Sequence, residues 1–146
     1  MRPSIPFILI LATQLALHGC RSIDRAMAEL PDEAPQAEVG PRVDLRERSA
    51  PFEITFADVI NDLLMVQVTY NGGCEDHSFH LLSNGKYTAT YPPEIVLHIR
   101  HDDHGDRCRG VVDEKRYFDL TNLRYPGTNR VRLVFHKTNK ILDYIY

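Results

Sequence analysis

The chain has 146 residues, of which 43% are hydrophobic and 25% are charged, a composition typical of a soluble protein with one modest domain. Its 17 lysines and arginines against 20 aspartates and glutamates give a formal net charge of −3. Such a chain has no basic field to hold a phosphate backbone, so we expect no nucleic-acid partner.

The N-terminal residues 1–19 have the features of a lipoprotein signal peptide. Arg2 supplies one positive charge, and an apolar run from Phe7 to Leu17 follows it. This run covers about half of the roughly 20 residues that a membrane-spanning helix needs, so the sequence predicts no permanent transmembrane helix here.

The segment LHGC at residues 17–20 resembles the lipobox of bacterial lipoproteins, in which the signal peptide is cut before a cysteine that carries a diacylglycerol. By this resemblance Cys20 is the lipidation site, and its acyl chains, such as palmitate, insert into the lipid bilayer. Arg21 rather than an aspartate follows Cys20, which by resemblance to Gram-negative lipoproteins favours the outer membrane. The resemblance therefore implies a cell-envelope protein that faces the periplasm.

Residues 20–51 are predicted to be the lipidated cysteine and a disordered tether. Four prolines and no aromatic residue occur between residues 21 and 51. A stretch of this kind cannot bury enough apolar surface to offset its ordering entropy. The folded domain is then predicted over residues 52–146.

Within residues 52–146, apolar and polar side chains alternate with the period of β-strands. The pattern predicts strands at 51–56, 63–70, 77–82, 86–91, 94–101, 108–120, 131–137 and 141–146. The dipeptide Asn84-Gly85 predicts a two-residue hairpin, since both positions tolerate positive φ. The expected fold is all-β, an antiparallel Ig-like β-sandwich of seven or eight short strands, with a small closed β-barrel as the alternative.

The cysteines of the exported domain form an even pair if Cys20 is lipidated. Cys74 and Cys108 then remain in an oxidising compartment, which favours a disulfide between them. The bond would close a loop of roughly 35 residues, which the chain-entropy model values at about 4 kcal/mol.

A metal site is the alternative use of the same region. Cys74, His77, His104 and Cys108 have the residue types and approximate spacings of a Cys₂His₂ zinc site, although exported thiols tend to oxidise. A second version keeps the disulfide and uses nitrogen and oxygen ligands for zinc or another divalent metal. Its candidate ligands are His77, His101, Asp103 and Asp106.

The alternative without a metal or other cofactor is purely structural. Residue His77 would hydrogen-bond a nearby carboxylate, and Asp106 is the candidate because the disulfide would bring the two backbones together. Catalysis finds less support, since the sequence has no G-x-S-x-G, H-E-x-x-H or phosphate-binding glycine motif. We therefore expect no enzyme, with a hydrolase as the third possibility.

Three segments together resemble a group of small bacterial envelope lipoproteins: GGCEDHSFHL, YPPEIVLHIRHDDHGDRC and YFDLTNL. The first contains the pattern GGC-x2-H-x-F-x-L. The matched positions are Gly72, Gly73, Cys74, His77, Phe79, Leu81, Pro92, Pro93, His101, Asp106, Cys108, Phe118, Asp119 and Leu120. The likeness extends to the NigD-like lipoproteins and implies a β-rich, disulfide-bearing domain without an established reaction.

Two classes of function follow from these observations. The first is a membrane-anchored binding or structural module that contacts another envelope protein or a cell-wall component. The second is a metal-binding lipoprotein that uses His77 and the loop at residues 101–108.

Overall fold

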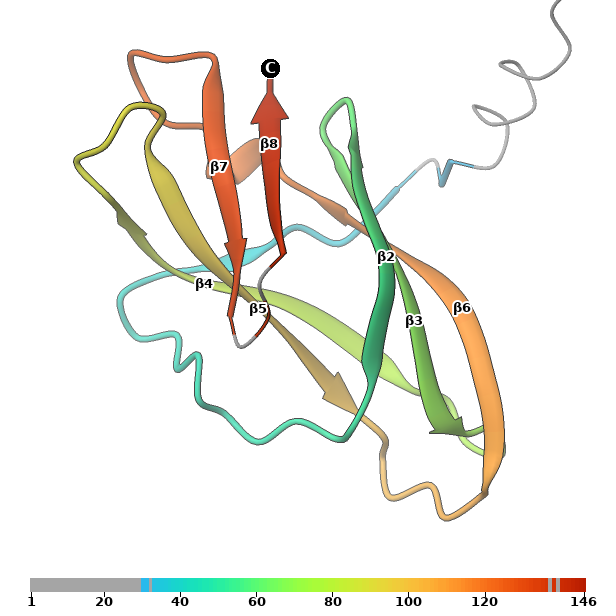
Figure 1. The fold of residues 1–146 in the computed structure, drawn as a ribbon. Coiled ribbons are helices and arrows are strands. Elements are labelled where there is room, and N and C mark those ends of the chain that lie inside the picture. Colours follow the sequence, from blue (N-terminus) through green and yellow to red (C-terminus); the bar gives the residue numbers. More distant parts are fainter. Residues whose placement is uncertain (1–29, 32, 137, 139) are drawn as a thin grey trace, which may run out of the picture. The chain divides into compact units, whose positions relative to one another are not determined.

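A computed structural model describes residues 30, 31, 33–136, 138 and 140–146 of the chain (Figure 1). The predicted signal peptide and the lipidation site Cys20 lie outside these residues, so the structure does not test them. Within the described part of the chain, no helix is long and apolar enough to cross a membrane.

Two open β-sheets make up the fold (Figure 1). The eight strands found among the described residues are β1 (Glu38–Val39), β2 (Glu53–Ile60), β3 (Leu63–Gly72), β4 (Ser78–Tyr87), β5 (Glu94–Asp102), β6 (Gly110–Asp119), β7 (Arg130–Phe135) and β8 (Ile141–Ile145). One sheet has the order β2-β3-β6, and the other has the order β1-β4-β5-β7-β8. The all-β prediction with two packed sheets is confirmed, and the described strands do not close into a barrel.

The larger sheet is mixed rather than purely antiparallel. Strands β1 and β4 pair in parallel, and so do β5 and β7, while every pair in the β2-β3-β6 sheet is antiparallel. The parallel β5–β7 pair arises because the chain leaves the larger sheet after β5, forms β6 in the smaller sheet and then returns. A short 3₁₀ turn at Thr121–Leu123 starts this return.

The core lies between the sheets and uses the predicted inward-facing rows. Its largest groups of buried side chains come from β3, β5 and β7, namely Leu64, Val66, Val68 and Tyr70, then Ile95, Leu97 and Ile99, then Val131, Leu133 and Phe135. Strand β2 departs from its predicted alternation, because a bulge between Ile54 and Phe56 shifts the register. Phe56 is consequently 49% exposed, and Ala57 packs against the core in its place.

The predicted hairpin at Asn84-Gly85 is wrong. Strand β4 continues through this dipeptide to Tyr87, and the positive φ of Gly85, 68°, serves a bulge opposite β5. The chain reverses at residues 88–93 instead, where Pro92 and Pro93 follow one another. Residues 88–91, predicted as strand, therefore belong to the turn between β4 and β5.

The predicted tether ends earlier than expected, because Pro31 and the described residues 33–51 belong to the same compact unit as the sheets. Strand β1 pairs with β4, and the Ala37 side chain is buried in the core. The Asn122 side chain donates a hydrogen bond of 2.6 Å to the Ala37 carbonyl. Low apolar content did not prevent ordering here, because this segment fills out the edge of an existing sheet instead of building its own core.

Candidate functional site

The disulfide end of the domain lies where the chain crosses between the two sheets. Cys74 follows β3 and Cys108 precedes β6, and the structure joins them in a disulfide with a Cα–Cα distance of 6.0 Å. The bond therefore links the connection from β3 to β4 with the connection from β5 to β6.

The Asp106 carboxylate binds the backbone on both sides of this disulfide. One oxygen, Oδ1, accepts a hydrogen bond from the Cys108 amide at 2.7 Å. The other, Oδ2, accepts from the amides of Cys74 at 3.0 Å and Glu75 at 3.2 Å. These donors, led by Cys108, hold the pKa of the Asp106 carboxyl far below its usual range, so Asp106 is a carboxylate.

A buried pair of histidines continues from Asp106 into the core. The Nε2 atom of His77 lies 3.2 Å from Asp106 Oδ2, and its Nδ1 atom lies 2.7 Å from His101 Nε2. A carboxylate can only accept, so His77 donates from Nε2, and in its neutral form its Nδ1 accepts from His101. Burial, followed by the neighbouring His77, lowers the pKa of His101. Among the described residues, no partner meets hydrogen-bond geometry at His101 Nδ1.

Aromatic packing and one glycine position these rings. The His101 ring stacks on Phe79 at 4.4 Å between centroids, because the two residues are register partners in β4 and β5. The His77 ring stacks on Tyr70 at 4.5 Å. A Cβ atom on Gly72 would lie 2.7 Å from His77 Nε2 and 3.0 Å from Asp106 Oδ2, so this position needs glycine for space.

The four predicted metal ligands occupy different positions around this network. His77, His101 and Asp106 come together, but His101 and Asp106 contact opposite nitrogens of the His77 ring. Asp103 is outside the chain of contacts, since its Oδ1 accepts from the Gly105 amide at 3.1 Å. The arrangement is a hydrogen-bonded row rather than a set of donors around a common centre.

The predicted Cys₂His₂ set also separates in the structure. His104 uses its Nδ1 atom to contact the Asp76 carbonyl at 2.6 Å. Within the described part of the chain, one group of donor atoms lies within 4.8 Å of one another, and it consists of Cys74, Asp106 and Cys108. Both sulfur atoms of this group are committed to the disulfide.

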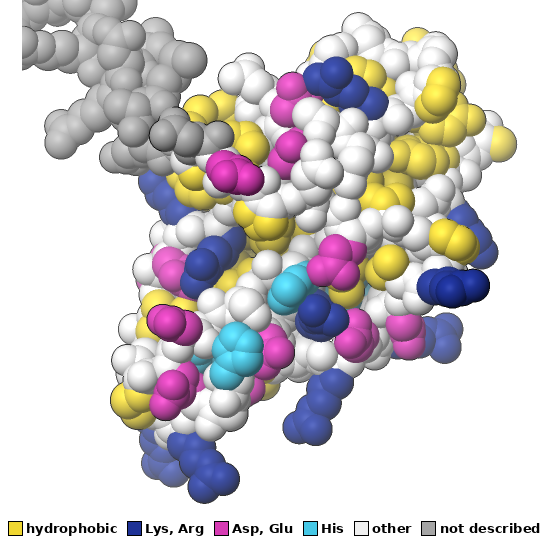
Figure 2. Space-filling view, turned by 180° about the vertical axis from the view of Figure 1, so that it is seen from behind, with side chains coloured by type: hydrophobic (Ala, Val, Ile, Leu, Met, Phe, Trp, Pro, Cys, Tyr) yellow, Lys and Arg dark blue, Asp and Glu magenta, His cyan; other side chains and the backbone are white. Residues whose placement is uncertain are grey.

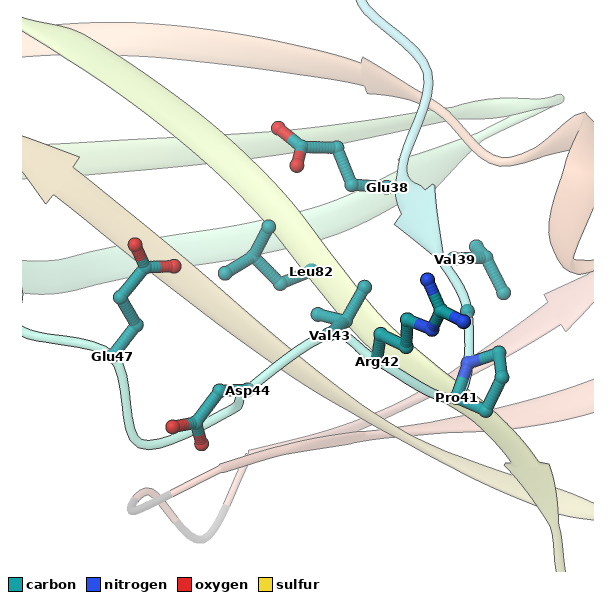
Figure 3. Close-up of a pocket in the computed structure, with 9 residues that line it drawn as sticks. Glu38, Val39, Pro41, Arg42, Val43, Asp44, Glu47 and Leu82 are labelled. Atoms are coloured by element: carbon teal, nitrogen blue, oxygen red, sulfur yellow. The ribbon is translucent and has the colours of Figure 1, made fainter.

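A broad depression of about 780 Å³ lies on the outer face of the larger sheet, between β1, β4 and the loop after β1 (Figure 3). Its apolar side chains are Val39, Pro41, Val43 and Leu82, and three carboxylates and Arg42 complete the charged part of the lining. Two of these carboxylates form ion pairs with the sheet: Glu38 of β1 contacts His80 of β4 at 2.9 Å, and Glu47 of the loop contacts Arg100 of β5 at 2.8 Å. We interpret this depression as a structural feature that forms where the loop after β1 covers the outer face of the larger sheet.

A second groove, of about 640 Å³, separates the start of β2 from β5 and the end of β7. Phe52, Ile54 and Phe135 contribute to its apolar lining. His98 also lines it and is 7% exposed, although the alternation in β5 predicts a solvated side chain. The His136 ring packs edge-on against the His98 ring, with 5.6 Å between the ring centroids.

The opposite end of the domain carries a surface that the sequence analysis missed. Here the turn between β4 and β5 meets the loop before β7 (Figure 1). Their shallow depression, which we call the tyrosine tip, is lined by Thr88, Ala89, Thr90, Tyr91, Pro93, Tyr125, Pro126, Gly127 and Thr128. Tyr91 is 88% exposed and Tyr125 is 40% exposed. The repeated dipeptide Tyr-Pro, at 91–92 and 125–126, is the signal that could have indicated this surface.

Hydrogen bonds hold the tyrosine tip in one conformation. The hydroxyl of Thr88 contacts that of Thr90 at 2.6 Å and accepts from the Glu94 amide at 2.9 Å. The Tyr125 amide donates to the Tyr146 hydroxyl at 2.8 Å, and the Tyr125 ring packs 4.8 Å from Tyr87. The side chains are thus presented on an ordered backbone.

The charged side chains show no field of a single sign. On the face seen in Figure 2, basic and acidic groups alternate, and hydrophobic groups gather toward one end of the domain. The formal net charge of −3 agrees with this mixed distribution. That face therefore gives no electrostatic reason to expect a polyanionic partner.

Comparison with known proteins identifies the fold. No protein-family model matches the chain, and no curated protein sequence matches it. A NigD-like immunity protein from Bacteroides caccae superposes with a TM-score of 0.55 at 10% identity, over 75% of this chain and 58% of that chain. A DUF1344 protein of unknown function from Bacteroides vulgatus gives 0.52 at 17% identity, over 77% and 57%.

A third similar structure, from Parabacteroides distasonis, is described as a toxin-related protein. It gives a TM-score of 0.50 at 16% identity, over 77% of this chain and 59% of that chain. At such low identities the three structures show a shared fold. This chain spans less than two thirds of the length of each of them.

Proposed function

We propose that this protein is a lipoprotein of the cell envelope whose β-sandwich is a non-enzymatic binding module, and that it contacts another envelope protein through the tyrosine tip. The observation that carries the proposal is the lining of that tip, which contains no charged residue among nine. Since 25% of the chain is charged, about two charged residues would be expected there. Depletion of charge together with exposed tyrosine is the composition of protein interfaces.

Energetic considerations support the same surface. Tyrosine offers a large contact area and has only two side-chain torsions to order, so it is favoured at binding hot spots. The hydrogen bonds that fix Thr88 and Tyr125 lower the ordering cost further. Tyr91 gives up no intramolecular packing of comparable size when it binds, because it is 88% exposed.

The similar structures accord with a protein-binding role, since one is a NigD-like immunity protein and another is a toxin-related protein. The membrane anchor rests on the sequence, where LHGC at residues 17–20 offers Cys20 for acylation. In this arrangement the acyl chains hold the protein at the outer membrane, and the segment between Cys20 and Pro31 connects them to the domain.

Site-specific photocrosslinking tests the proposal in cells. A photoreactive amino acid replaces Tyr91 in one variant and Val111 in the control, which is a 74% exposed apolar residue on β6 at the other end of the domain. We expect a discrete protein adduct from position 91 and none from position 111. The captured protein is then purified, and its affinity is measured directly.

The affinity measurement uses matched alanine variants. Tyr91→Ala and Tyr125→Ala should each weaken binding at least about tenfold, whereas Val111→Ala should change it less than about twofold. Equal adducts at both positions, or an affinity that survives both tyrosine substitutions, would exclude the tyrosine tip as the binding surface.

A further inference from the structure

The disulfide end holds a set of donor atoms that the sequence-based metal predictions did not combine. The sulfur atoms of Cys74 and Cys108 lie within 4.8 Å of each other and of an Asp106 carboxylate oxygen. Asp106 Oδ2 is in turn 3.2 Å from His77 Nε2. Two sulfurs and one oxygen therefore form one group, and the His77 nitrogen lies beside the Asp106 oxygen but outside the 4.8 Å limit of that group.

We propose that reduction of the disulfide turns this cluster into a binding site for a thiophilic divalent cation such as zinc, with Cys74, Cys108, Asp106 and His77 as ligands. Zinc binds cysteine, histidine and carboxylate donors in four-coordinate tetrahedral sites. Bond lengths of about 2.0 to 2.3 Å place neighbouring tetrahedral donors roughly 3.3 to 3.8 Å apart. The three donors of the 4.8 Å group need small shifts to reach these spacings. His77 lies 3.2 Å from Asp106 but outside that group, so its ring must also move closer to the sulfur atoms.

A dithiol can reduce the disulfide before zinc binds. The dithiol gives two electrons to the bond between Cys74 and Cys108 and becomes a disulfide itself, and its two protons are transferred to the released sulfurs. Zinc then displaces both protons to solvent and binds two thiolates. The oxidised and metal-bound forms are mutually exclusive because they use the same sulfur atoms.

The histidine pair supplies the proton shift that His77 needs. To bind a metal through Nε2, His77 must carry its proton on Nδ1, which lies 2.7 Å from His101 Nε2. The Nε2 proton of His101 passes to His77 Nδ1, and the Nε2 proton of His77 is released to solvent. One proton from solvent is taken up at His101 Nδ1, the buried nitrogen without a hydrogen-bond partner among the described residues, so the net charge of the pair is unchanged.

This arrangement gives the site a built outer shell. Metal-binding histidines usually donate their second ring N–H to a neighbouring acceptor, which fixes the tautomer and the ring orientation. His101 would be that acceptor, and it is 2% exposed. Gly72 leaves the required room beside His77 Nε2 and Asp106 Oδ2, where any Cβ atom would intrude.

The test uses the full chain with Cys20→Ser, so that Cys74 and Cys108 are its two cysteines. The protein is reduced with a phosphine, which leaves no competing thiol, and is titrated with zinc under native mass spectrometry. One zinc per reduced chain and none per oxidised chain are expected. His77→Gln and Asp106→Asn should each lower the zinc affinity at least about tenfold, and His101→Leu about 10- to 100-fold.

His104→Gln is the matched control, because His104 lies in the same loop and contacts the Asp76 carbonyl instead. It should leave the zinc affinity unchanged. A loss equal to that of His77→Gln would favour the Cys₂His₂ set over the proposed one. Equal zinc binding by the oxidised protein would place the metal on the histidines and acids alone, and absence of zinc from the reduced protein would also overturn the proposal.

Cobalt absorption reports the metal ligands in the parent protein itself, so it tests the proposal even if a ligand variant does not fold. Cobalt bound to the reduced parent protein should show thiolate charge-transfer bands and the visible bands of a tetrahedral site. A Cys74→Ser variant should lose about half of the charge-transfer intensity, since one of two thiolates is removed. A cobalt spectrum without thiolate bands contradicts the proposed ligand set.

Discussion

Gly72→Ala should disturb the disulfide end of the domain through a single steric contact. The added Cβ atom would lie 2.7 Å from Cε1 and Nε2 of His77 and 3.0 Å from Asp106 Oδ2. Ordinary contacts begin near 3.4 Å, so the His77 ring must move by roughly 0.7 Å. Its 3.2 Å contact with Asp106 would then exceed hydrogen-bond distance. Overpacking of this kind costs about 1 to 3 kcal/mol of unfolding free energy.

Urea denaturation of the disulfide-intact protein measures this cost. Gly40→Ala is the matched control, since nothing lies within 4 Å of its added Cβ atom and its φ is not positive. It should change the unfolding free energy by less than about 0.5 kcal/mol. In a His77→Ala background, the cost of Gly72→Ala should shrink to a few tenths of a kcal/mol. An equal cost in both backgrounds would refute the steric explanation and indicate a backbone effect.

Three further predictions concern the disulfide, two tyrosines and the anchor. Replacing Cys74 and Cys108 together by alanine should lower the unfolding free energy by about 2 to 5 kcal/mol in urea denaturation, and free thiols at Cys74 and Cys108 in the native protein would contradict the disulfide. Burial raises the pKa of both Tyr87 and Tyr144 from 10.0 to about 12. Their contribution to stability is therefore complete below pH 10 and is lost as the pH rises toward 12, so melting temperatures should fall within this range. Cys20→Ser should move the protein from the membrane fraction to the soluble fraction, and an unchanged distribution on fractionation would exclude lipidation there.

The alternation of apolar residues predicted most of the core because it reports directly which face of a strand is buried. Leu64, Val66 and Val68 in β3 follow this rule without exception. The rule failed at Phe56 because a bulge inserts one residue and reverses the faces beyond it. Local sequence did not mark that bulge, which depends on how β2 pairs with β3.

Turn and tether signals were less informative because they describe local preferences. Gly85 does adopt positive φ, as its dipeptide predicts, but pairing with β5 uses that conformation for a bulge. The segment around Ala37 looked disordered by composition, yet the open edge of β4 provides backbone partners for it. Such long-range pairings are not visible in a short window of sequence.

The sequence likewise predicted some contacts of the candidate site and missed others. Spacing to the two cysteines predicted that His77 and Asp106 lie close together, and their side chains are 3.2 Å apart. The contact between His77 and His101 depends on the register that places His101 opposite Phe79, which the sequence did not specify. Asp103 and His104 were indistinguishable by residue type from the residues that enter the network, because loop conformation decides which side chains turn inward.

The position of the disulfide also determines how the chain can fold. The ladder between β3 and β6 begins at the pair Gly72 and Gly110, two residues beyond each cysteine. In the reduced chain this pairing must close a long loop that contains the entire β4–β5 hairpin, and this closure carries an entropic cost. In the oxidised chain the same strands meet as neighbours, so their effective contact order is that of a hairpin and folding accelerates. The order of oxidation and folding then matters, because a chain oxidised before it folds has its most remote antiparallel pairing already in register.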